Sequence, residues 1–319
     1  MDKKNIPYYN LYMPGKDMKK IVVITGASSG IGLETARVLI RENMHVVGLG
    51  RSSEKCDQAR DYITHKCPQK KEALHFIIAD LSSQREVKHA AGLIRDHLKA
   101  LGHPQLDVLI NNAGTVASHR IETIDGFELQ WAVNYLAPFL LTHQLFSLLN
   151  QGHDARILTV SSESHRGARI HWKDPNFHTG YNPLRSYKQS KLANVLFTKH
   201  FNQVFESITQ IKAFAVDPGL VRTEIGHKNT SGIAYWIWSI RQKSAVSAAE
   251  GAATSVYLST APRESISGKA YWKHCRPAKS SAYSDNTEAA EHLWKISEEM
   301  CGISFDHHPA SIGNNSALL

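Results

Sequence analysis

Short runs of apolar, largely β-branched residues alternate with longer helical patterns along most of this 319-residue chain. A short apolar run bounded by turn residues is typical of a buried strand, and apolar residues spaced three and four apart are typical of a helix. Repeated strand–helix–strand connections place a parallel sheet between two layers of helices. The sequence therefore predicts an α/β fold, with strands at 20–25, 45–50, 75–79, 106–110, 156–160, 211–216 and 268–272.

No long linker interrupts this alternation, so we predict a single domain over residues 19–302. Residues 1–18 contain two prolines and a glycine and predict an irregular N-terminal extension. The Asn- and Ser-rich residues 303–319 predict a mobile tail. Within the domain, helices are expected at 31–42, 54–65, 84–101, 126–149, 186–206, 247–259 and 288–300.

The composition argues against several classes of protein. Lysine and arginine outnumber aspartate and glutamate, 37 to 29, which gives a net charge of +8 and a pI near 9.2. The basic residues are spread along the chain and form no basic helix or stacking motif, so we expect a solvated basic surface and no nucleic-acid partner. The 18 histidines form no recognised ligand motif, and we expect no metal site.

Cysteine usage and apolar segments bear on the compartment. The four cysteines include no C-x-x-C pair, which fits a reducing compartment better than a disulfide framework. The N-terminus has no apolar core of signal-peptide length, and no apolar run is long enough to span a bilayer. We therefore expect a cytoplasmic protein, and a peripheral membrane contact stays open because of one apolar segment described below.

A glycine-rich loop follows the first expected strand and opens the first helix, in the order Thr25-Gly26-Ala27-Ser28-Ser29-Gly30-Ile31-Gly32. Gly26 lets the chain turn sharply off the strand, and the two later glycines allow close approach of backbone to a pyrophosphate and of helix to sheet. The free N–H groups of the helix N-terminus and the two serine hydroxyls are suitable phosphate donors. Because of its place between strand and helix, this loop predicts a Rossmann-type doubly wound parallel sheet of about seven strands that binds a dinucleotide.

The end of the second strand bears on which dinucleotide is bound. An acidic side chain at this position would bind the ribose hydroxyls of NAD. This chain has Gly50 followed by Arg51. Because no carboxylate repels a 2′-phosphate and a guanidinium can bind one, we predict NADP(H) over NAD(H). The alternative is that Arg51 is an ordinary surface arginine.

Five motifs, in this order, resemble those of the short-chain dehydrogenase/reductase superfamily. They are the glycine loop, Asp80 after the third strand, Asn111-Asn112-Ala113-Gly114, Tyr187-Lys188-Gln189-Ser190-Lys191, and Asp217-Pro218-Gly219-Leu220-Val221-Arg222-Thr223. The resemblance covers about residues 20–302. Within the superfamily the chain is most similar to retinol-dehydrogenase-like members, through the stretches 187–197, 218–224 and 293–294.

Tyr187 and Lys191 lie four residues apart on an expected helix and so share one face. A lysine ammonium favours the phenolate of a neighbouring tyrosine and lowers its pKa from about 10, toward a value useful for general acid–base catalysis. The resemblance implies that Lys191 also holds the nicotinamide ribose. It points to Ser162 as the residue whose hydroxyl binds the substrate oxygen, with Ser161 as the alternative.

The resemblance implies further roles for residues near the strand ends. Asn134, on a long helix, would position a water that relays protons to Lys191, and the alternative is a structural asparagine. Asp80 and Leu81 would flank the adenine, whereas Asn112 is expected to tie strands together. The other positions that it places at the cofactor are Ile31, Asn111, Ala113, Gly114, Pro218, Gly219, Val221 and Thr223, the last two at the nicotinamide carboxamide.

Two segments that resemble the family least are expected to form the substrate pocket. One is 163–185, which holds Trp172, Phe177 and Tyr181. The other is the apolar and aromatic run from Ile233 to Ile240. This run has three interpretations: a lid over a lipophilic substrate, a peripheral contact with a membrane surface, or a buried structural helix.

Together these residues predict an NADP(H)-dependent oxidoreductase that transfers a hydride between the nicotinamide and a carbonyl or alcohol of an apolar substrate. The substrate class would be a retinoid, a steroid or a fatty aldehyde, and the catalytic residues would be Ser162, Tyr187, Lys191 and Asn134. The alternative is an NADP(H)-binding sensor or scaffold without turnover, which would need neither Ser162 nor Tyr187. The resemblance also implies a homodimer, paired through the two long helices that carry Asn134 and Tyr187.

Overall fold

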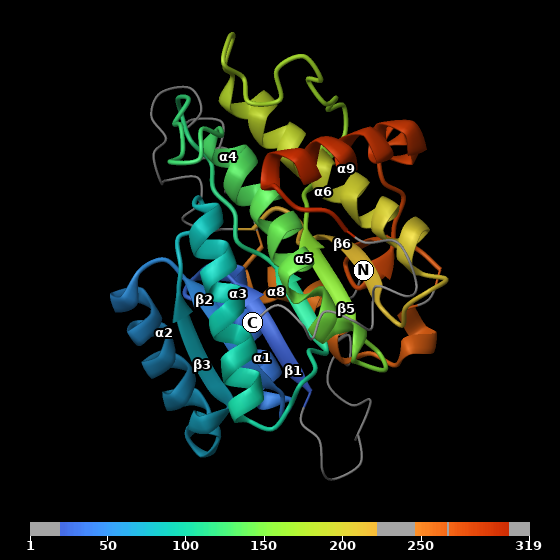
Figure 1. The fold of residues 1–319 in the computed structure, drawn as a ribbon. Helices are drawn as coiled ribbons and strands as arrows, with labels where there is room; N and C mark the ends of the chain where they lie inside the picture. Colours follow the sequence, from blue (N-terminus) through green and yellow to red (C-terminus); the bar gives the residue numbers. More distant parts are fainter. Residues whose placement is uncertain (1–19, 222–245, 267, 306–319) are drawn as a thin grey trace, which may run out of the picture.

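The computed structural model describes residues 20–221, 246–266 and 268–305, which are arranged around one sheet (Figure 1). Several predicted features lie outside the described residues. These are the extension 1–18, Thr223, the apolar run from Ile233 to Ile240, and the tail beyond Phe305.

The sheet contains β1 Ile21–Thr25, β2 His45–Gly50, β3 Leu74–Ile78, β4 Val108–Asn111, β5 Arg156–Val160, β6 Lys212–Asp217, β7 Tyr271–Lys273 and β8 Arg276–Pro277. Their order across the sheet is β3-β2-β1-β4-β5-β6-β7-β8. Strands β1 to β7 are parallel, as predicted, and the two-residue β8 pairs antiparallel with β7 and adds an eighth strand to the seven expected. All residues of β1, β2, β4 and β5 are buried because helices cover both faces.

The helices are α1 Gly30–Arg41, α2 Ser53–Lys66, α3 Gln84–Ala100, α4 Leu129–Trp131, α5 Ala137–Asn150, α6 Pro183–Phe205, α8 Ala248–Thr260 and α9 Thr287–Cys301. A π-helical turn, Ala132–Leu136, joins α4 to α5. Short 3-10 turns are η1 Pro68–Ala73, η3 Glu163–His165, η6 Arg263–Ile266 and η7 Ala282–Asp285. Side chains cap the N-termini of most of these helices. For example, Ser52, Ser83 and Asn182 accept backbone N–H groups of α2, α3 and α6.

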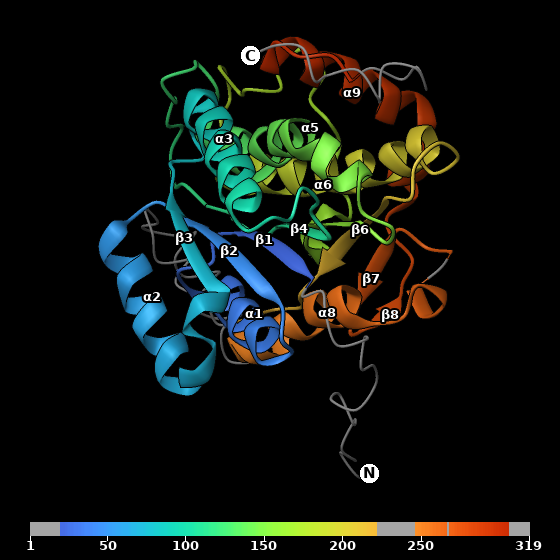
Figure 2. The same ribbon diagram turned by 60° about the horizontal axis from the view of Figure 1, so that its bottom comes forward.

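The two helical layers lie on opposite faces of the sheet. Helices α3, α5 and α6 cover one face, and α1, α2 and α8 cover the other (Figures 1 and 2). The chain builds outward from β1 to β3 and then crosses back to β4, so the winding direction reverses between β1 and β4. Ligands of doubly wound sheets bind at the carboxyl ends of the strands beside such a reversal.

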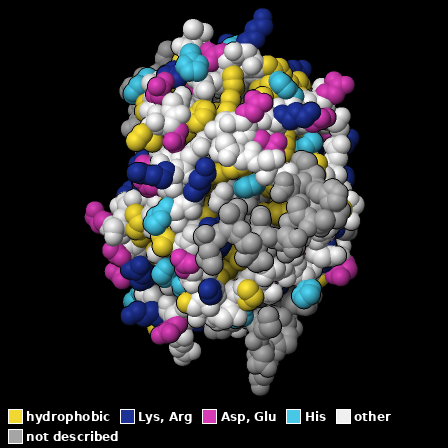
Figure 3. Space-filling view, viewed as in Figure 1, with side chains coloured by type: hydrophobic (Ala, Val, Ile, Leu, Met, Phe, Trp, Pro, Cys, Tyr) yellow, Lys and Arg dark blue, Asp and Glu magenta, His cyan; other side chains and the backbone are white. Residues whose placement is uncertain are grey.

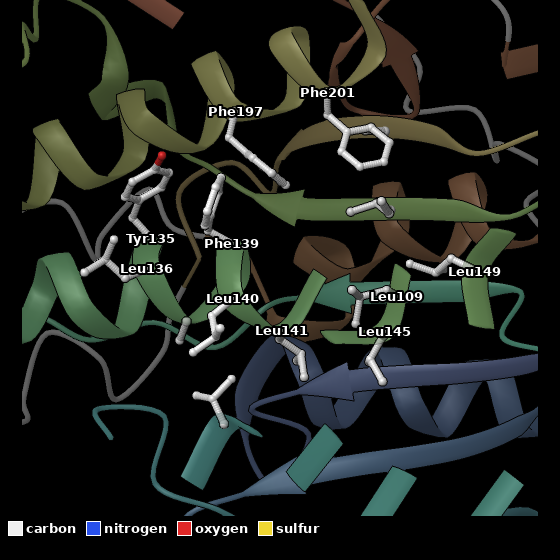
Figure 4. Packing of buried hydrophobic residues seen from close by; sticks show 14 of the residues in the cluster. Leu109, Tyr135, Leu136, Phe139, Leu140, Leu141, Leu145, Leu149, Phe197 and Phe201 are labelled. Atoms are coloured by element: carbon white, nitrogen blue, oxygen red, sulfur yellow. The ribbon is translucent and has the colours of Figure 1, made fainter. Parts of the chain in front are cut away.

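The largest part of the core lies between the sheet and the helices α5 and α6 (Figure 4). Phe139 of α5 and Phe197 of α6 meet edge to face, with ring centroids 5.7 Å apart. The predicted helix 126–149 begins only at Leu129, because the Glu128 carboxylate accepts the N–H groups of Gln130 and Trp131 and caps the helix there.

The C-terminal helix α9 lies over α5 and α6 (Figure 2). Trp294 of α9 packs edge-on against Phe139 at 5.1 Å and stacks near Phe197 at 5.8 Å. Phe305 is 3% exposed and lies 4.7 Å from Trp294, so the packed chain extends beyond the boundary predicted at residue 302. The chain's own last helix therefore packs against the two long helices through which the homodimer was expected to pair.

One helical stretch among the described residues, Leu129–Asn150, is long and apolar enough to cross a membrane. Within this stretch, 72% of the most apolar window is buried inside the protein. Its composition is therefore accounted for by its place in the core beneath α9.

Candidate active site

A cleft of 740 Å³ runs along the carboxyl ends of the parallel strands, in the position expected for a dinucleotide. Its described walls come from the loop after β1, from the ends of β2 to β6, and from α6. The predicted site residues that line it are Gly26, Ser28, Ser29, Gly30, Ile31, Arg51, Asp80, Leu81, Ala113, Gly114, Ser162, Tyr187, Lys191, Pro218, Gly219 and Val221. Gly32, Asn111 and Asn134 are outside this lining.

The glycine loop presents backbone donors to the cleft. Gly26 and Gly30 have φ of 67° and 55°, a backbone region that favours glycine, and no side chain caps the N-terminus of α1. Gly32 has a different part, because a Cβ there would lie 2.2 Å from the carbonyl oxygen of Gly26 and 2.5 Å from Asn112 Nδ2. Gly32 therefore allows α1 to pack against the loop and does not face the cleft.

Thr25 and Asn112 fasten the glycine loop to the end of β4. Thr25 Oγ1 accepts the N–H groups of Asn112 and Ala113, both at 2.9 Å, and Asn112 Nδ2 donates to the Thr25 carbonyl at 2.8 Å. Asn112 thus ties the strands together, as predicted. Asn111 was expected at the cofactor, but its side chain is buried and donates to Thr142 Oγ1 of α5 at 3.2 Å.

The cleft end beside β2 and β3 is partly basic. Arg51 lies exposed at the rim, and Lys55 and Gln58 of α2 line the same end. Lys55 was not predicted at this end of the cleft, although it follows Arg51 by four residues in a helix that starts just after β2. Asp80 lies beside these residues and accepts the Ser82 N–H at 2.9 Å, which shapes the turn after β3.

At the other end of the cleft, the two candidate serines have different partners. The Ser161 hydroxyl is buried and donates to the backbone carbonyl of Lys191 at 2.8 Å. Ser162 is hydrogen-bonded to the Tyr187 hydroxyl and has Ser164 Oγ 3.1 Å from its own Oγ. Ser162 is therefore the serine that the fold joins to the tyrosine.

Tyr187 and Lys191 share one face of α6, as their spacing predicts. Lys191 Nζ lies 5.7 Å from the centroid of the Tyr187 ring and donates to the Val160 carbonyl at 2.9 Å. Asn134 lies on the π-helical turn close by: a Cβ on Gly114 would be 3.5 Å from Asn134 Oδ1 and 3.6 Å from Lys191 Nζ. Gly114 thus leaves room for the cleft between these polar groups.

The Asn134 side chain is hydrogen-bonded to the loop after β4. Its Oδ1 accepts the Thr115 N–H at 2.7 Å, and its Nδ2 donates to the Thr115 carbonyl at 3.0 Å and to Ser190 Oγ at 3.1 Å. Its backbone carbonyl accepts Asn194 Nδ2 at 3.0 Å. These bonds tie the loop after β4 to α6, which is a structural part for Asn134, and its place at a proton-relay water stays a prediction.

Burial has the largest effect on the pKa values of Tyr187 and Lys191. It raises the pKa of Tyr187 to about 12, although the hydrogen bond from Ser162 lowers that pKa, and the Asp217 carboxylate raises it further. Burial also lowers the pKa of Lys191 to about 8. The expected depression of the Tyr187 pKa is therefore not present in the protein alone, because burial of the phenol disfavours its charged form.

The segment 163–185 differs from its predicted place. Trp172 packs against His292 of α9 at 4.6 Å, and the Tyr181 hydroxyl donates to the Ala117 carbonyl at 3.2 Å. Phe177 is buried and stacks on His171 at 5.3 Å. None of these three aromatic residues lines the described cleft, where the segment contributes only Ser164. Apolar periodicity does not reveal which neighbour an aromatic side chain will find.

The geometry fits a dinucleotide laid along the strand ends, with free N–H donors at the glycine loop and a hydroxyl pair at the far end. The described residues 20–221 lie entirely within the part of the chain, residues 20–234, that matches the family model described as short chain dehydrogenase. The chain belongs to the short chain dehydrogenase family. It is therefore an oxidoreductase that uses a nicotinamide cofactor on a small-molecule substrate.

Individual relatives of this short chain dehydrogenase agree with the resemblance to retinol-dehydrogenase-like members. Human retinol dehydrogenase 14 is 34% identical over 310 residues, which cover 91% of this chain and 88% of the relative. Human polyprenol dehydrogenase is 33% identical over 294 residues, which cover 89% and 86%. A solved structure of a putative uncharacterized protein from Mycobacterium paratuberculosis is 30% identical, with a TM-score of 0.68 over 90% of this chain and 95% of that one.

Proposed function

We propose that this short chain dehydrogenase depends on NADP(H) and transfers a hydride between the nicotinamide and the carbonyl or alcohol of an apolar substrate. The observation that carries the proposal is the meeting of Ser162, Tyr187 and Lys191 at one end of a cleft whose other end is the glycine loop. A sensor or scaffold would need the loop, but it would have no use for two hydrogen-bonded hydroxyls above a buried ammonium.

The described residues suit the reduction of a carbonyl. When bound, the reduced nicotinamide supplies the hydride. The Ser162 hydroxyl donates a hydrogen bond to the substrate oxygen and stabilises the charge that develops there. Tyr187 donates its proton to that oxygen, and a pKa of about 12 keeps this proton in place throughout the neutral range. The charge on Lys191 below about pH 8 stabilises the phenolate left behind.

Residues along the cleft have the chemistry to hold the cofactor. The loop from Gly26 to Ile31 offers N–H groups and hydroxyls to the pyrophosphate. Arg51 and Lys55 would hold the 2′-phosphate that distinguishes NADP(H) from NAD(H). The remaining assignments are Asp80 and Leu81 at the adenine, Ala113 and Gly114 along the cofactor, Lys191 at the nicotinamide ribose, Pro218, Gly219, Val221 and Thr223 at the carboxamide, and Asn134 at a proton-relay water.

An apolar substrate is supported by part of the cleft wall and by the relatives. Leu129, Val133 and Leu220 line the described cleft that also holds Tyr187. The relatives are named for retinol and polyprenol, which are both lipophilic alcohols. We propose a retinoid, a steroid or a fatty aldehyde as the substrate class, with the run from Ile233 to Ile240 as its lid or as a peripheral membrane contact.

We also propose a cytoplasmic location, which the four free cysteines support. On the face shown in Figure 3, basic and acidic side chains are interspersed, as expected for a solvated surface and not for a nucleic-acid site. The homodimer stays a prediction.

The test is NADPH consumption, followed by the absorbance of the reduced nicotinamide, with retinal, a steroid ketone, a long-chain aldehyde and a small aromatic carbonyl. A Tyr187→Phe variant is assayed alongside Tyr257→Phe, which changes a tyrosine of α8 outside the described cleft. We expect turnover with an apolar carbonyl that is lost only in Tyr187→Phe. Tight NADPH binding without turnover would favour the sensor, and failure to bind NADPH would refute the proposal.

A further inference from the structure

A buried histidine that takes no part in the chemistry above lies directly behind Ser162. His165 ends the 3-10 turn η3 and is 0% exposed. Its Nδ1 lies 2.7 Å from the Ser162 carbonyl oxygen, and its Nε2 lies 2.9 Å from the backbone nitrogen of Ser281. It does not line the cleft, so direct contact with substrate or cofactor does not explain it.

The two partners determine the tautomer of His165. The Ser281 N–H can only donate, so Nε2 must accept and must carry no proton. The ring proton is therefore on Nδ1, where it donates to the Ser162 carbonyl. Burial lowers the pKa of His165, which keeps the ring in this neutral form. Both ring nitrogens are thus used, and the histidine connects the serine backbone to the C-terminal segment.

The segment at the other end of this connection is itself held in place. The Arg166 guanidinium donates to the carbonyl oxygens of Lys279 and Ser280, the latter at 3.2 Å. Lys199 Nζ donates to Ser280 Oγ at 2.7 Å. The Tyr271 ring lies 5.0 Å from the His165 ring and covers it. The hydrogen bond between His165 and Ser281 therefore attaches the histidine to a segment that other hydrogen bonds already hold in place.

The backbone of the catalytic serine is held on both sides. On one side, the Ser161 N–H donates to the Val216 carbonyl at 2.7 Å, where β5 pairs with β6. On the other side, the Ser162 carbonyl accepts both the His165 backbone N–H, at 3.0 Å, and the Nδ1–H of the His165 ring. Rotation about the Cα–C bond of Ser162 would break both bonds. Ser162 Oγ itself accepts the Ser164 N–H at 3.2 Å, a bond that also requires this backbone position.

We propose that His165 is a positioning residue, which holds the Ser162 carbonyl and thereby aims the Ser162 hydroxyl at Tyr187 and the substrate oxygen. This inference rests on the proposed function, because it assigns to His165 a part in the same reaction. His165 acts through Ser162 and transfers no proton itself.

Two substitutions of His165 test its hydrogen bonds to Ser162 and to Ser281 separately. In His165→Asn the side-chain amide can still donate where Nδ1 did, but it does not reach Ser281. In His165→Gln the amide oxygen can accept from Ser281, but the Ser162 carbonyl loses its side-chain donor and keeps only the backbone N–H of residue 165. His200→Gln, which changes another buried histidine, on the outer side of α6 against Trp294, is the control for loss of a buried ring.

We expect His165→Gln to lower kcat about tenfold, as for one lost hydrogen bond, with the Kd for NADPH unchanged. His165→Asn should retain most of the wild-type kcat. In a Ser162→Ala background, His165→Gln should lower the residual kcat by less than about twofold, because the group that it positions is absent. Equal losses in the two His165 variants, or an undiminished effect in the Ser162→Ala background, would overturn the inference.

A second measurement is independent of turnover. The ¹³C chemical shift of the Ser162 carbonyl should change in His165→Gln and stay near its wild-type value in His165→Asn and His200→Gln. If the wild-type protein showed no turnover, the proposed function would fail, but this shift would still report whether His165 holds Ser162. If the ¹³C chemical shift of the Ser162 carbonyl did not change in His165→Gln, the inference itself would be overturned.

Discussion

Two glycines near the cleft are expected to respond differently to substitution by alanine. Gly32→Ala should destabilise the fold, and Gly114→Ala should weaken NADPH binding. In Gly32→Ala the new methyl would lie 2.2 Å from the Gly26 carbonyl oxygen, so α1 or the glycine loop must move. Overpacking against backbone costs about 3 kcal/mol, and the better helix propensity of alanine returns at most about 1 kcal/mol. We expect the free energy of unfolding to fall by about 2 kcal/mol.

Gly114→Ala adds a methyl at ordinary contact distance, 3.5 Å from Asn134 Oδ1 and 3.6 Å from Lys191 Nζ. The fold should therefore tolerate it, with a change in unfolding free energy within about 0.5 kcal/mol. The methyl projects into the cleft, where overpacking of about 2 kcal/mol would weaken NADPH binding about thirtyfold.

Urea denaturation followed by fluorescence measures the first effect, and isothermal titration with NADPH measures the second. Gly92→Ala is the control, because the nearest atom to a Cβ at this half-buried position of α3 is 3.9 Å away. The reasoning is refuted if Gly114→Ala destabilises the fold more than Gly32→Ala does, or if Gly114→Ala binds NADPH as tightly as the wild type.

Three further predictions follow from the cleft and the core. Arg51→Ala should raise the Kd for NADPH about tenfold and leave the Kd for NADH within about threefold, since only NADPH carries the 2′-phosphate; equal changes for both cofactors, measured by titration, would contradict the specificity proposal. Because burial lowers the pKa of Lys191 to about 8, its charge is present below that pH and lost above it, so the kcat of reduction should decline as the pH rises through about 8; a pH–rate profile that stays flat to about pH 10, the ordinary range of lysine, would argue against this. Trp294→Ala should lower the unfolding free energy by about 3–5 kcal/mol in urea, because it empties the space between α9 and the aromatic side chains of α5 and α6; a loss below about 1 kcal/mol would mean that α9 is only loosely attached.

Local sequence patterns predicted the elements well, because they depend on neighbours along the chain. The apolar runs became strands within three residues of their predicted bounds. The glycine loop lies between β1 and α1, and Tyr187 and Lys191 share a face of α6, as a spacing of four residues requires. The fold class and the family were both predictable from these patterns.

Where the local pattern was silent, the predictions were wrong or left open. Ser161 and Ser162 are adjacent in sequence, and only the packing of β5 against α6 directs the first hydroxyl to the Lys191 backbone and leaves the second to Tyr187. The aromatic residues of 163–185 were expected around the substrate, but contacts with α9 and with the loop after β4 hold them elsewhere.

The sequence by itself thus determined the α/β fold, the order of its strands and helices, and the residue types at the carboxyl edge of the sheet. Periodicity, turn residues and motif spacing are properties of short stretches, which is why they can be read before the chain is folded. Only the tertiary structure decided that α9 covers α5 and α6, that Gly32 serves packing while Gly114 faces the cleft, and that His165 stands between Ser162 and Ser281. Each of these features depends on contacts between residues far apart in the chain. The lowered pKa of Lys191 depends on such contacts as well, because they bury its ammonium.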